Sequence, residues 1–203
     1  MIFYYMTGTC SLASHIALEH VGVDYEARKI DFRNNQQRSK EYLAVNPKGR
    51  VPALVTDAGI ITENPAILYY IAQTHPNAGI APLDDAGELA QVMAFNAYLS
   101  STVHVAHAHG ARPYRWADDE EAMTEMKRKM PQVMTDCFSM IEESMLVGPW
   151  VRGDQYTICD MYLFTIAQWL EGDNVDIEQF PKVNALRERM RADETVQRTM
   201  ALQ

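Results

Sequence analysis

A single cysteine near the N-terminus is the residue of this sequence best placed for thiol chemistry. Cys10 stands in the segment GTCSLASHIAL, after turn-forming residues and at the predicted start of a helix. The free N–H groups and the positive dipole end of a helix start stabilise a thiolate and so lower the pKa of a cysteine. Free cysteine is also among the most buried residue types. Cys10 is therefore either a reactive thiolate or a small core residue.

Three histidines lie close together in the segment STVHVAHAHGARP, at His104, His107 and His109. Imidazole exchanges protons near neutral pH, which makes these residues candidates for acid–base chemistry beside a thiol. Their spacing does not put all three on one helical face, and no cysteine or glutamate follows at metal-ligand spacing. We expect no metal here, and we expect His107 and His109 either to line a pocket or to face solvent.

Two further segments predict sites made largely by the backbone. Val51-Pro52 precedes a β-rich run, and proline belongs at the start or edge of a strand because it lacks an N–H donor. Glu63 and Asn64 stand where a strand is predicted to end and a helix to begin, with Pro65 next. Such a helix start binds anions through its amides and dipole. Asn64 either helps to bind a ligand or only caps the helix.

The elements that must position these residues divide the chain in two. Residues 1–77 predict the order β-α-β-α-β-β-α, with strands near 2–5, 24–31, 51–56 and 60–62 and the clearest helices ending at Gly22 and Thr74. Thr9 or Ser11 is expected to cap the first helix. Residues 78–86 are the predicted linker, and residues 87–203 are predicted to be helical, with patterns over 88–111, 119–146, 158–170 and 183–191. Thr157 and Asp160 have the spacing of a capping box.

Composition excludes several classes of function. The formal charge of −9 opposes binding to nucleic acid phosphate, and no apolar run approaches the length of a membrane span. The N-terminus lacks the features of a secretory signal. Three widely spaced cysteines without a CxxC pair indicate neither a disulfide framework nor a zinc site. We therefore expect a cytoplasmic protein that binds no nucleic acid, no membrane and no metal.

Taken together, these features resemble the cytosolic glutathione transferases, and most closely their bacterial beta class. The segments GTCSLASHIAL, AVNPKGRVPALV, ITENPAILYYIA and GDQYTICDMYLFT resemble the corresponding family segments in the same order. The resemblance implies an α/β thioredoxin-like N-terminal domain with a mixed sheet and an all-α C-terminal domain. It also implies a homodimeric detoxification enzyme that binds reduced glutathione as co-substrate and transfers its thiolate to a small apolar electrophile.

The resemblance implies roles for the thiol and its neighbours. Cys10 would lie beside the glutathione sulfur, where it can form a mixed disulfide, and His104 would lie near both sulfur atoms. The Val51–Pro52 bond would be cis, so that the main chain of Val51 pairs with the peptide backbone of glutathione. The electrophile would bind between His104 and Trp116, with Tyr114 in the same wall.

The resemblance also implies how the two ends of glutathione are held. Glu63 and Asn64 would receive the γ-glutamyl end, the ammonium near the acidic side chain and the carboxylate at the helix start. Asn35 stands where the beta class often has a lysine for the glycine carboxylate. Asn96 lies beside Ala97, the position from which an asparagine of that class reaches the neighbouring subunit's glutathione. Other cations could meet the glycine carboxylate, namely Arg28, Arg33, Arg38 and Lys48.

Two alternative functions remain open. In the first, Cys10 attacks a disulfide or a peroxide, and glutathione resolves the resulting intermediate because no second cysteine is adjacent. In the second, the protein is a non-catalytic binding module, since one fold can serve several functions. Conjugation that survives the loss of Cys10 would separate the transferase from the first alternative.

Overall fold

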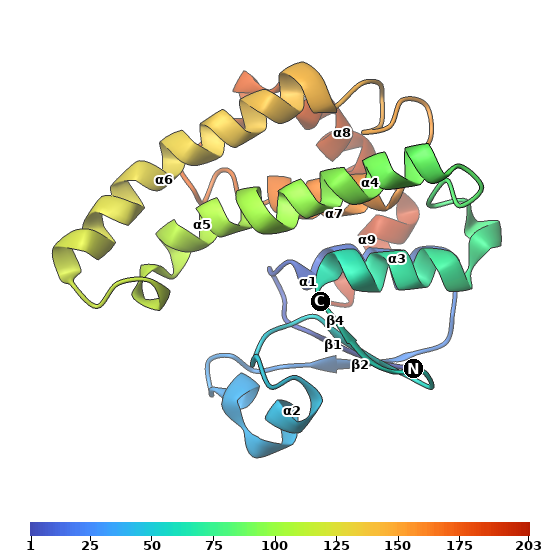
Figure 1. The fold of residues 1–203 in the computed structure, drawn as a ribbon, viewed down its shortest axis with the longest axis horizontal. Coiled ribbons are helices and arrows are strands. Elements are labelled where there is room, and N and C mark those ends of the chain that lie inside the picture. The colour runs from blue at the N-terminus through green and yellow to red at the C-terminus, as the bar shows by residue number, and fades with distance from the viewer.

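The computed structural model describes residues 1–203, with a small mixed sheet at one end and a larger group of helices above it (Figure 1). The N-terminal elements follow the predicted order β-α-β-α-β-β-α. Their bounds are β1 Ile2–Tyr5, α1 Ser11–Val21, β2 Glu26–Lys29, α2 Lys40–Val45, β3 Ala53–Thr56, β4 Gly59–Thr62 and α3 Asn64–Thr74.

The strand order in the sheet is β2-β1-β3-β4, with β1 parallel to β2 and the other neighbours antiparallel. Helices α1 and α3 cover one face and α2 lies against the other (Figure 1). Because side chains alternate along a strand, Phe3 and Tyr5 join the main core, whereas Tyr4 packs against Tyr42 of α2. The sheet thus holds α1, which begins just after Cys10, between itself and the helical domain.

The helical half contains two long helical runs that are each modified by a π turn. The elements are α4 Ala86–Tyr98, a π turn Leu99–Val103, α5 His104–Ala111, α6 Glu120–Met140, a π turn Ile141–Met145, α7 Ile158–Ala167, α8 Pro181–Ala192 and α9 Glu194–Ala201. Helix α9 has no counterpart among the predicted helices. None of the helices combines the length and the apolar character needed to cross a membrane.

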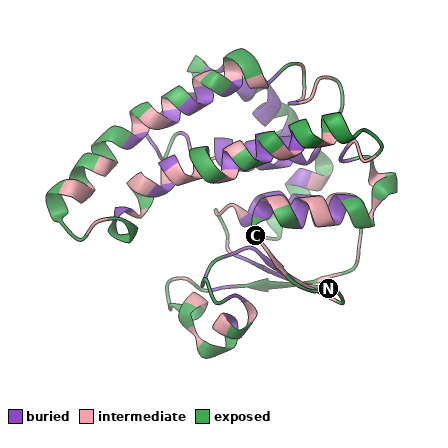
Figure 2. Ribbon diagram, viewed as in Figure 1, coloured by how far each residue is buried: buried purple, intermediate pink, exposed green.

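Helix α7 is the central element of the core. All of its residues are buried (Figure 2), as expected for a helix that is apolar on every side. It packs against α1, and one continuous cluster of buried side chains runs from Phe3 in the sheet to Val196 in α9. The two halves of the chain therefore share a core, which fixes α1 relative to the helical domain.

Helix ends show which predicted caps form. The capping box of Thr157 and Asp160 is present, and Gly22 ends α1 in the left-handed conformation with φ of 67°, so both predictions are confirmed. At α1, Cys10 occupies the N-cap position and its own side chain makes no capping bond, but Thr9 Oγ1 accepts from the Ser11 N–H at 3.4 Å, so of the two predicted residues Thr9 contributes a bond at the helix start. Asn64 is not a cap: it is the first residue of α3, after Glu63 at the cap position.

Candidate active site

The thiol of Cys10 lies against the backbone of Val51. Its Sγ donates to the Val51 carbonyl oxygen at 3.6 Å, and the Val51–Pro52 peptide bond is cis. Cys10 comes from the start of α1 and Val51 from the segment before β3, so the fold brings together two residues 41 positions apart. The fold thus places this thiol beside the backbone segment that contains the cis bond.

Burial has the largest effect on the ionisation state of Cys10. Burial raises its pKa to about 12, opposed by the positive charge of Arg112 and reinforced by the negative charge of Glu63. A backbone N–H and Arg50 also lower the pKa, but less than burial raises it. A helix start contributes only roughly 0.3–1 kcal/mol, whereas desolvation can shift a pKa by about 3 units or more. Of the two alternatives that the sequence left open, the raised pKa of Cys10 therefore favours a thiol over a thiolate in the protein alone.

Asn64 fixes the start of α1 relative to the start of α3. Its side chain is buried, its Nδ2 donates to the Cys10 carbonyl oxygen at 2.6 Å, and its Oδ1 accepts from Ser14 Oγ at 2.5 Å. These bonds use the amide within the protein, which is the physical reason that it does not cap α3. The side chain of Asn64 thus positions Cys10, while its backbone N–H belongs to the helix start available to an anion.

Glu63 is exposed. Its φ of 76° is positive, which is uncommon for a residue other than glycine. Its carboxylate pairs with Lys48, whose ammonium also donates to Thr62 Oγ1 at 2.7 Å. A ligand ammonium at Glu63 therefore competes with Lys48 for the same carboxylate. Lys48 is correspondingly less free to meet a carboxylate elsewhere.

The side chains that could bind the glycine carboxylate of glutathione differ in whether they already have partners within the protein. Asn35 is exposed in the left-handed conformation with φ of 56°, and its side chain forms no hydrogen bond. Arg28 is committed to Glu26 at 2.7 Å and to the Tyr4 hydroxyl at 3.0 Å. Arg38 is exposed and lies beside Gly49, where an added Cβ would stand 2.9 Å from its Nη1. Arg33 and Arg38 stand two residues before and three residues after Asn35, and both are exposed and form no ion pair, so either is free to meet a carboxylate.

The structure does not support the role expected of Asn96. Its side chain is fully buried in the helical domain, and neither its Oδ1 nor its Nδ2 has a hydrogen-bond partner in the protein. A side chain in this position cannot reach glutathione bound to a neighbouring subunit. Ala97, the next residue, is the exposed one.

The unpartnered amide of Asn96 leads to a stability prediction. Replacing Asn96 with leucine, which has a similar shape, is expected to raise the free energy of unfolding by roughly 1–2 kcal/mol, because a buried polar group without partners is costly. Urea unfolding followed by circular dichroism measures this change. A decrease of the same size would show that the amide is satisfied in solution.

His104 begins α5 directly after the π turn Leu99–Val103, an insertion that changes the face on which later residues lie. Its ring packs against Trp169 with centroids 5.0 Å apart, and neither of its ring nitrogens bonds another protein group. Burial lowers the pKa of His104 to about 4, helped by the charges of Arg112, His107, Arg50 and Arg115. At neutral pH the imidazole is therefore uncharged.

Two arginine side chains exert an electrostatic effect on both Cys10 and His104. Arg112 and Arg50 are the two guanidinium groups whose positive charge acts on both Cys10 and His104. The Nε of Arg112 is buried and has no partner in the protein. In an acidic chain, this local positive charge favours the binding of an anion near these two residues.

The sequence did not indicate three residues beside His104. Arg112 is the first of them, because no local sequence pattern indicated that its positive charge acts on Cys10 and His104. The others are Trp169, which packs against two histidines, and Asp173, which bonds His107 across 66 positions of sequence. Contacts between residues so far apart leave no periodic signal. Across the whole chain, no group of three or more His, Cys, Asp or Glu side chains is arranged to hold a metal.

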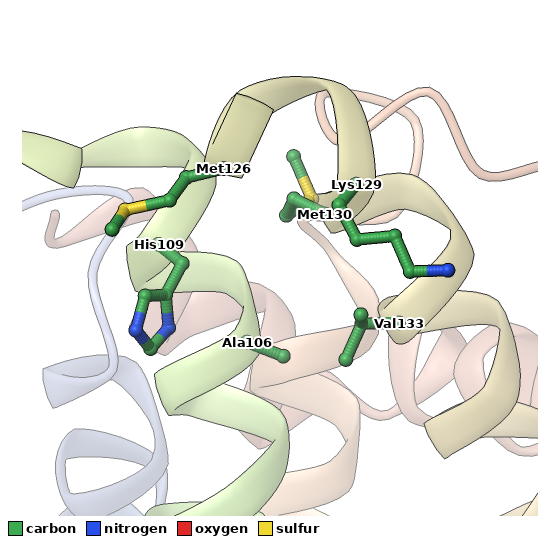
Figure 3. A pocket seen from close by; sticks show the side chains of 6 residues that line it. All are labelled: Ala106, His109, Met126, Lys129, Met130 and Val133. Atoms are coloured by element: carbon green, nitrogen blue, oxygen red, sulfur yellow. The ribbon is translucent and has the colours of Figure 1, made fainter. Parts of the chain in front are cut away.

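A cavity of about 190 Å³ lies between α5 and α6 (Figure 3). Its lining residues are Ala106, His109, Met126, Lys129, Met130 and Val133. The predicted wall from His104 to Trp116 reaches it only through Ala106 and His109. The ring of His109 stacks on Trp116 with centroids 4.2 Å apart, and Tyr114 is exposed. Neither Cys10 nor His104 lines this cavity, so we do not assign it to the thiol chemistry.

Comparison with known proteins identifies both halves of the chain. Residues 1–73 match the family model "Glutathione S-transferase, N-terminal domain", and residues 102–194 match "Glutathione S-transferase, C-terminal domain". Glutathione S-transferase GstA of Escherichia coli O157:H7 is 31% identical over 193 residues, which cover 94% of this chain and 92% of that protein.

Solved structures agree with the sequence matches. A glutathione transferase homologue from Sulfitobacter, solved with bound glutathione, is 38% identical, has a TM-score of 0.95, and aligns over 99% of this chain and 97% of its own. The bacterial beta class glutathione S-transferase of Sphingomonas chungbukensis is 30% identical with a TM-score of 0.87, over 100% and 98%.

These comparisons confirm the fold class predicted from the sequence, a thioredoxin-like domain followed by a helical domain. They also confirm the predicted enzyme class, a glutathione transferase. With both domain models matched in order and relatives similar over nearly their whole length, this chain belongs to the glutathione S-transferase family.

Proposed function

We propose that this transferase is a beta-class enzyme that conjugates reduced glutathione to small apolar electrophiles. The observation that carries the proposal is the contact of Cys10 Sγ with the Val51 carbonyl oxygen at 3.6 Å, with the start of α3 tied to Cys10 through Asn64. The thiol, the backbone segment that leads into β3 and the start of α3 are thus brought together by the fold. A tripeptide thiol with a peptide backbone and a terminal carboxylate complements all three.

The electrostatics support activation of the glutathione thiol. Positive charge from Arg112 and Arg50 acts at both Cys10 and His104, and a thiolate placed between these residues would be stabilised by it. The uncharged imidazole of His104 has free ring nitrogens for a hydrogen bond to the ligand sulfur. Most of the rate gain then comes from a thiolate held ready beside its electrophile.

The redox alternative is less well supported, because an attacking cysteine must be ionised. With its pKa raised to about 12, Cys10 is almost entirely a thiol at neutral pH. No observation in the structure favours the non-catalytic binding module. Conjugation is therefore the function proposed here.

Replacing Cys10 with alanine tests this choice. The variant is expected to keep at least about a third of the wild-type kcat with glutathione and a chloronitroaromatic substrate, since the Cys10 thiol neither attacks nor carries the charge. Reduction of a glutathione mixed disulfide, where the wild type shows it, is expected to disappear. Cys137→Ala, which removes a buried cysteine of α6, is the matched control. Loss of conjugation in Cys10→Ala, with conjugation retained in Cys137→Ala, would contradict a conjugating reaction that does not need the Cys10 thiol.

Several features of the family are also proposed for this chain. We propose a cytoplasmic homodimer with a role in detoxification, divided into domains at residues 78–86. The support is the resemblance together with the match to both domain models. Light scattering on the purified protein measures its mass in solution, and a value near the chain mass of 23.1 kDa would contradict the dimer.

A further inference from the structure

A histidine–aspartate pair lies one helical turn from His104 and has no part in the function described so far. His107 Nδ1 is 2.8 and 2.9 Å from the two carboxylate oxygens of Asp173, and Asp173 is only 4% exposed. A carboxylate accepts hydrogen bonds only, so the proton on His107 Nδ1 is assigned by this contact. The pair therefore orients the imidazole and leaves Nε2 as its working nitrogen.

The imidazole rings of His107 and His104 pack against the same tryptophan. Both rings pack against Trp169, at 5.0 Å for His104 and 4.4 Å for His107, and the two residues are one helical turn apart on α5. Nε2 of His107 has no hydrogen-bond partner in the protein and is not among the fully buried polar atoms. The indole of Trp169 thus has an imidazole packed against it from both His104 and His107.

We propose that His107, oriented by Asp173, protonates the electrophile, and that the enzyme is adapted to α,β-unsaturated carbonyl compounds. This inference rests on the proposed conjugating function and names the substrate class of the same site. An enone needs a proton when it accepts a thiolate, whereas an aryl chloride does not. The apolar face of Trp169 suits the carbon skeleton of such a substrate.

The proposed step balances without any further reagent. The thiolate sulfur of glutathione forms a C–S bond to the β-carbon, and the C=C electron pair moves toward the carbonyl oxygen to give an enolate. Protonated His107 then donates its Nε2 proton to the α-carbon, whose new C–H bond uses the enolate electron pair. His107 takes a proton back from solvent, to which the glutathione thiol proton was released. With an aryl chloride, chloride leaves with the C–Cl electron pair and no proton is added.

Nearby positive charge would assist this step. Arg112 and Arg115 act electrostatically on His104, the neighbour of His107 on the same face of α5. An enolate oxygen carries negative charge that guanidinium groups stabilise, which lowers the barrier to addition. The adduct formed from a chloronitroaromatic is an anion too and gains from the same charges, so the two substrates differ in their need for a proton.

The pair could instead serve only to tie α5 to the segment that follows α7. That segment already has a purely structural ion pair two residues away, in which Glu171 bonds buried Arg187 at 2.6 Å. Glu171→Gln and Asp173→Asn both replace a carboxylate with an amide in one segment, but only Asp173→Asn alters a hydrogen-bond partner of His107. Glu171→Gln is therefore the matched control for local loosening.

The test compares kcat for an enone and for a chloronitroaromatic substrate, each at saturating glutathione, in the wild type, His107→Phe, Asp173→Asn and Glu171→Gln. We expect the ratio of enone to aryl-chloride kcat to fall at least about tenfold in the first two variants, since general acid catalysis is commonly worth at least that. The ratio should stay within about twofold of wild type in Glu171→Gln. In His107→Ala, added imidazole should restore enone turnover selectively.

The outcomes separate this inference from the function on which it rests. If the wild type turns over neither substrate, the conjugating function fails. If the wild type turns over both but His107→Phe lowers both equally or neither, the role of His107 is wrong. An equal change of ratio in Glu171→Gln would likewise overturn it, because loosening of the segment would then explain the effect.

Discussion

Replacing Glu63 with glutamine is expected to raise the Kd for reduced glutathione by roughly ten- to hundredfold. The change removes the negative charge proposed to receive the ligand ammonium, and a hydrogen bond to a charged group is worth roughly 1.5–3 kcal/mol. Glutamine keeps the side-chain length and retains the same demand for a positive φ. Calorimetric titration of both proteins with glutathione measures the change.

A glutathione analogue without its α-amino group isolates the interaction. It should bind the wild type more weakly than glutathione does, while Glu63→Gln should bind the two ligands almost equally. Lys48→Met is the second comparison, because Lys48 now occupies the Glu63 carboxylate. Its removal frees that carboxylate and should leave the affinity for glutathione unchanged or improved. Equal losses for both ligands in Glu63→Gln would exclude the proposed contact.

Replacing Asp160 with alanine is expected to lower the free energy of unfolding by about 4 kcal/mol, without any contact with the proposed ligand. The buried carboxylate accepts from the Val151 and Thr157 N–H groups, each at 2.7 Å, and from Thr157 Oγ1 at 3.1 Å. Alanine loses a helix cap worth about 1 kcal/mol and strands two buried donors at roughly 1–3 kcal/mol each.

Urea unfolding at pH 7.5 measures this loss. Burial raises the pKa of Asp160 to about 6, so at that pH the carboxylate is mostly ionised and acts only as an acceptor. Asp85→Ala is the control, because Asp85 caps α4 with bonds of 2.9 and 3.0 Å but is exposed. Its loss should cost only about 1 kcal/mol. Equal costs for the two variants would show that the buried donors at Val151 and Thr157 find other partners.

The fold followed from the sequence because its signals are local. Strand-forming runs, Gly22 at a helix end, and the spacing of Thr157 and Asp160 each act over a few residues, and all three are confirmed. Helix α9 carries such a signal too, since Asp193 accepts from the N–H groups of Thr195 and Val196, but its eight residues are too few for a clear period.

The site was less predictable because its properties depend on long-range packing. The raised pKa of Cys10 comes mainly from burial in the folded protein, which outweighs the effect of the helix start that the local pattern reveals. The π turn at Leu99–Val103 interrupts a pattern that reads as one helix, so the sequence did not show that Asn96 points inward while His104 meets Trp169. The His107–Asp173 pair likewise forms only in the folded chain.

A crystal structure of the protein with reduced glutathione tests the central proposal most directly. We expect the ligand sulfur to touch Cys10 Sγ, the cysteinyl backbone of glutathione to pair with the main chain of Val51, and its ammonium to lie at Glu63. A ligand sulfur found elsewhere, for example in the cavity between α5 and α6, would contradict the account.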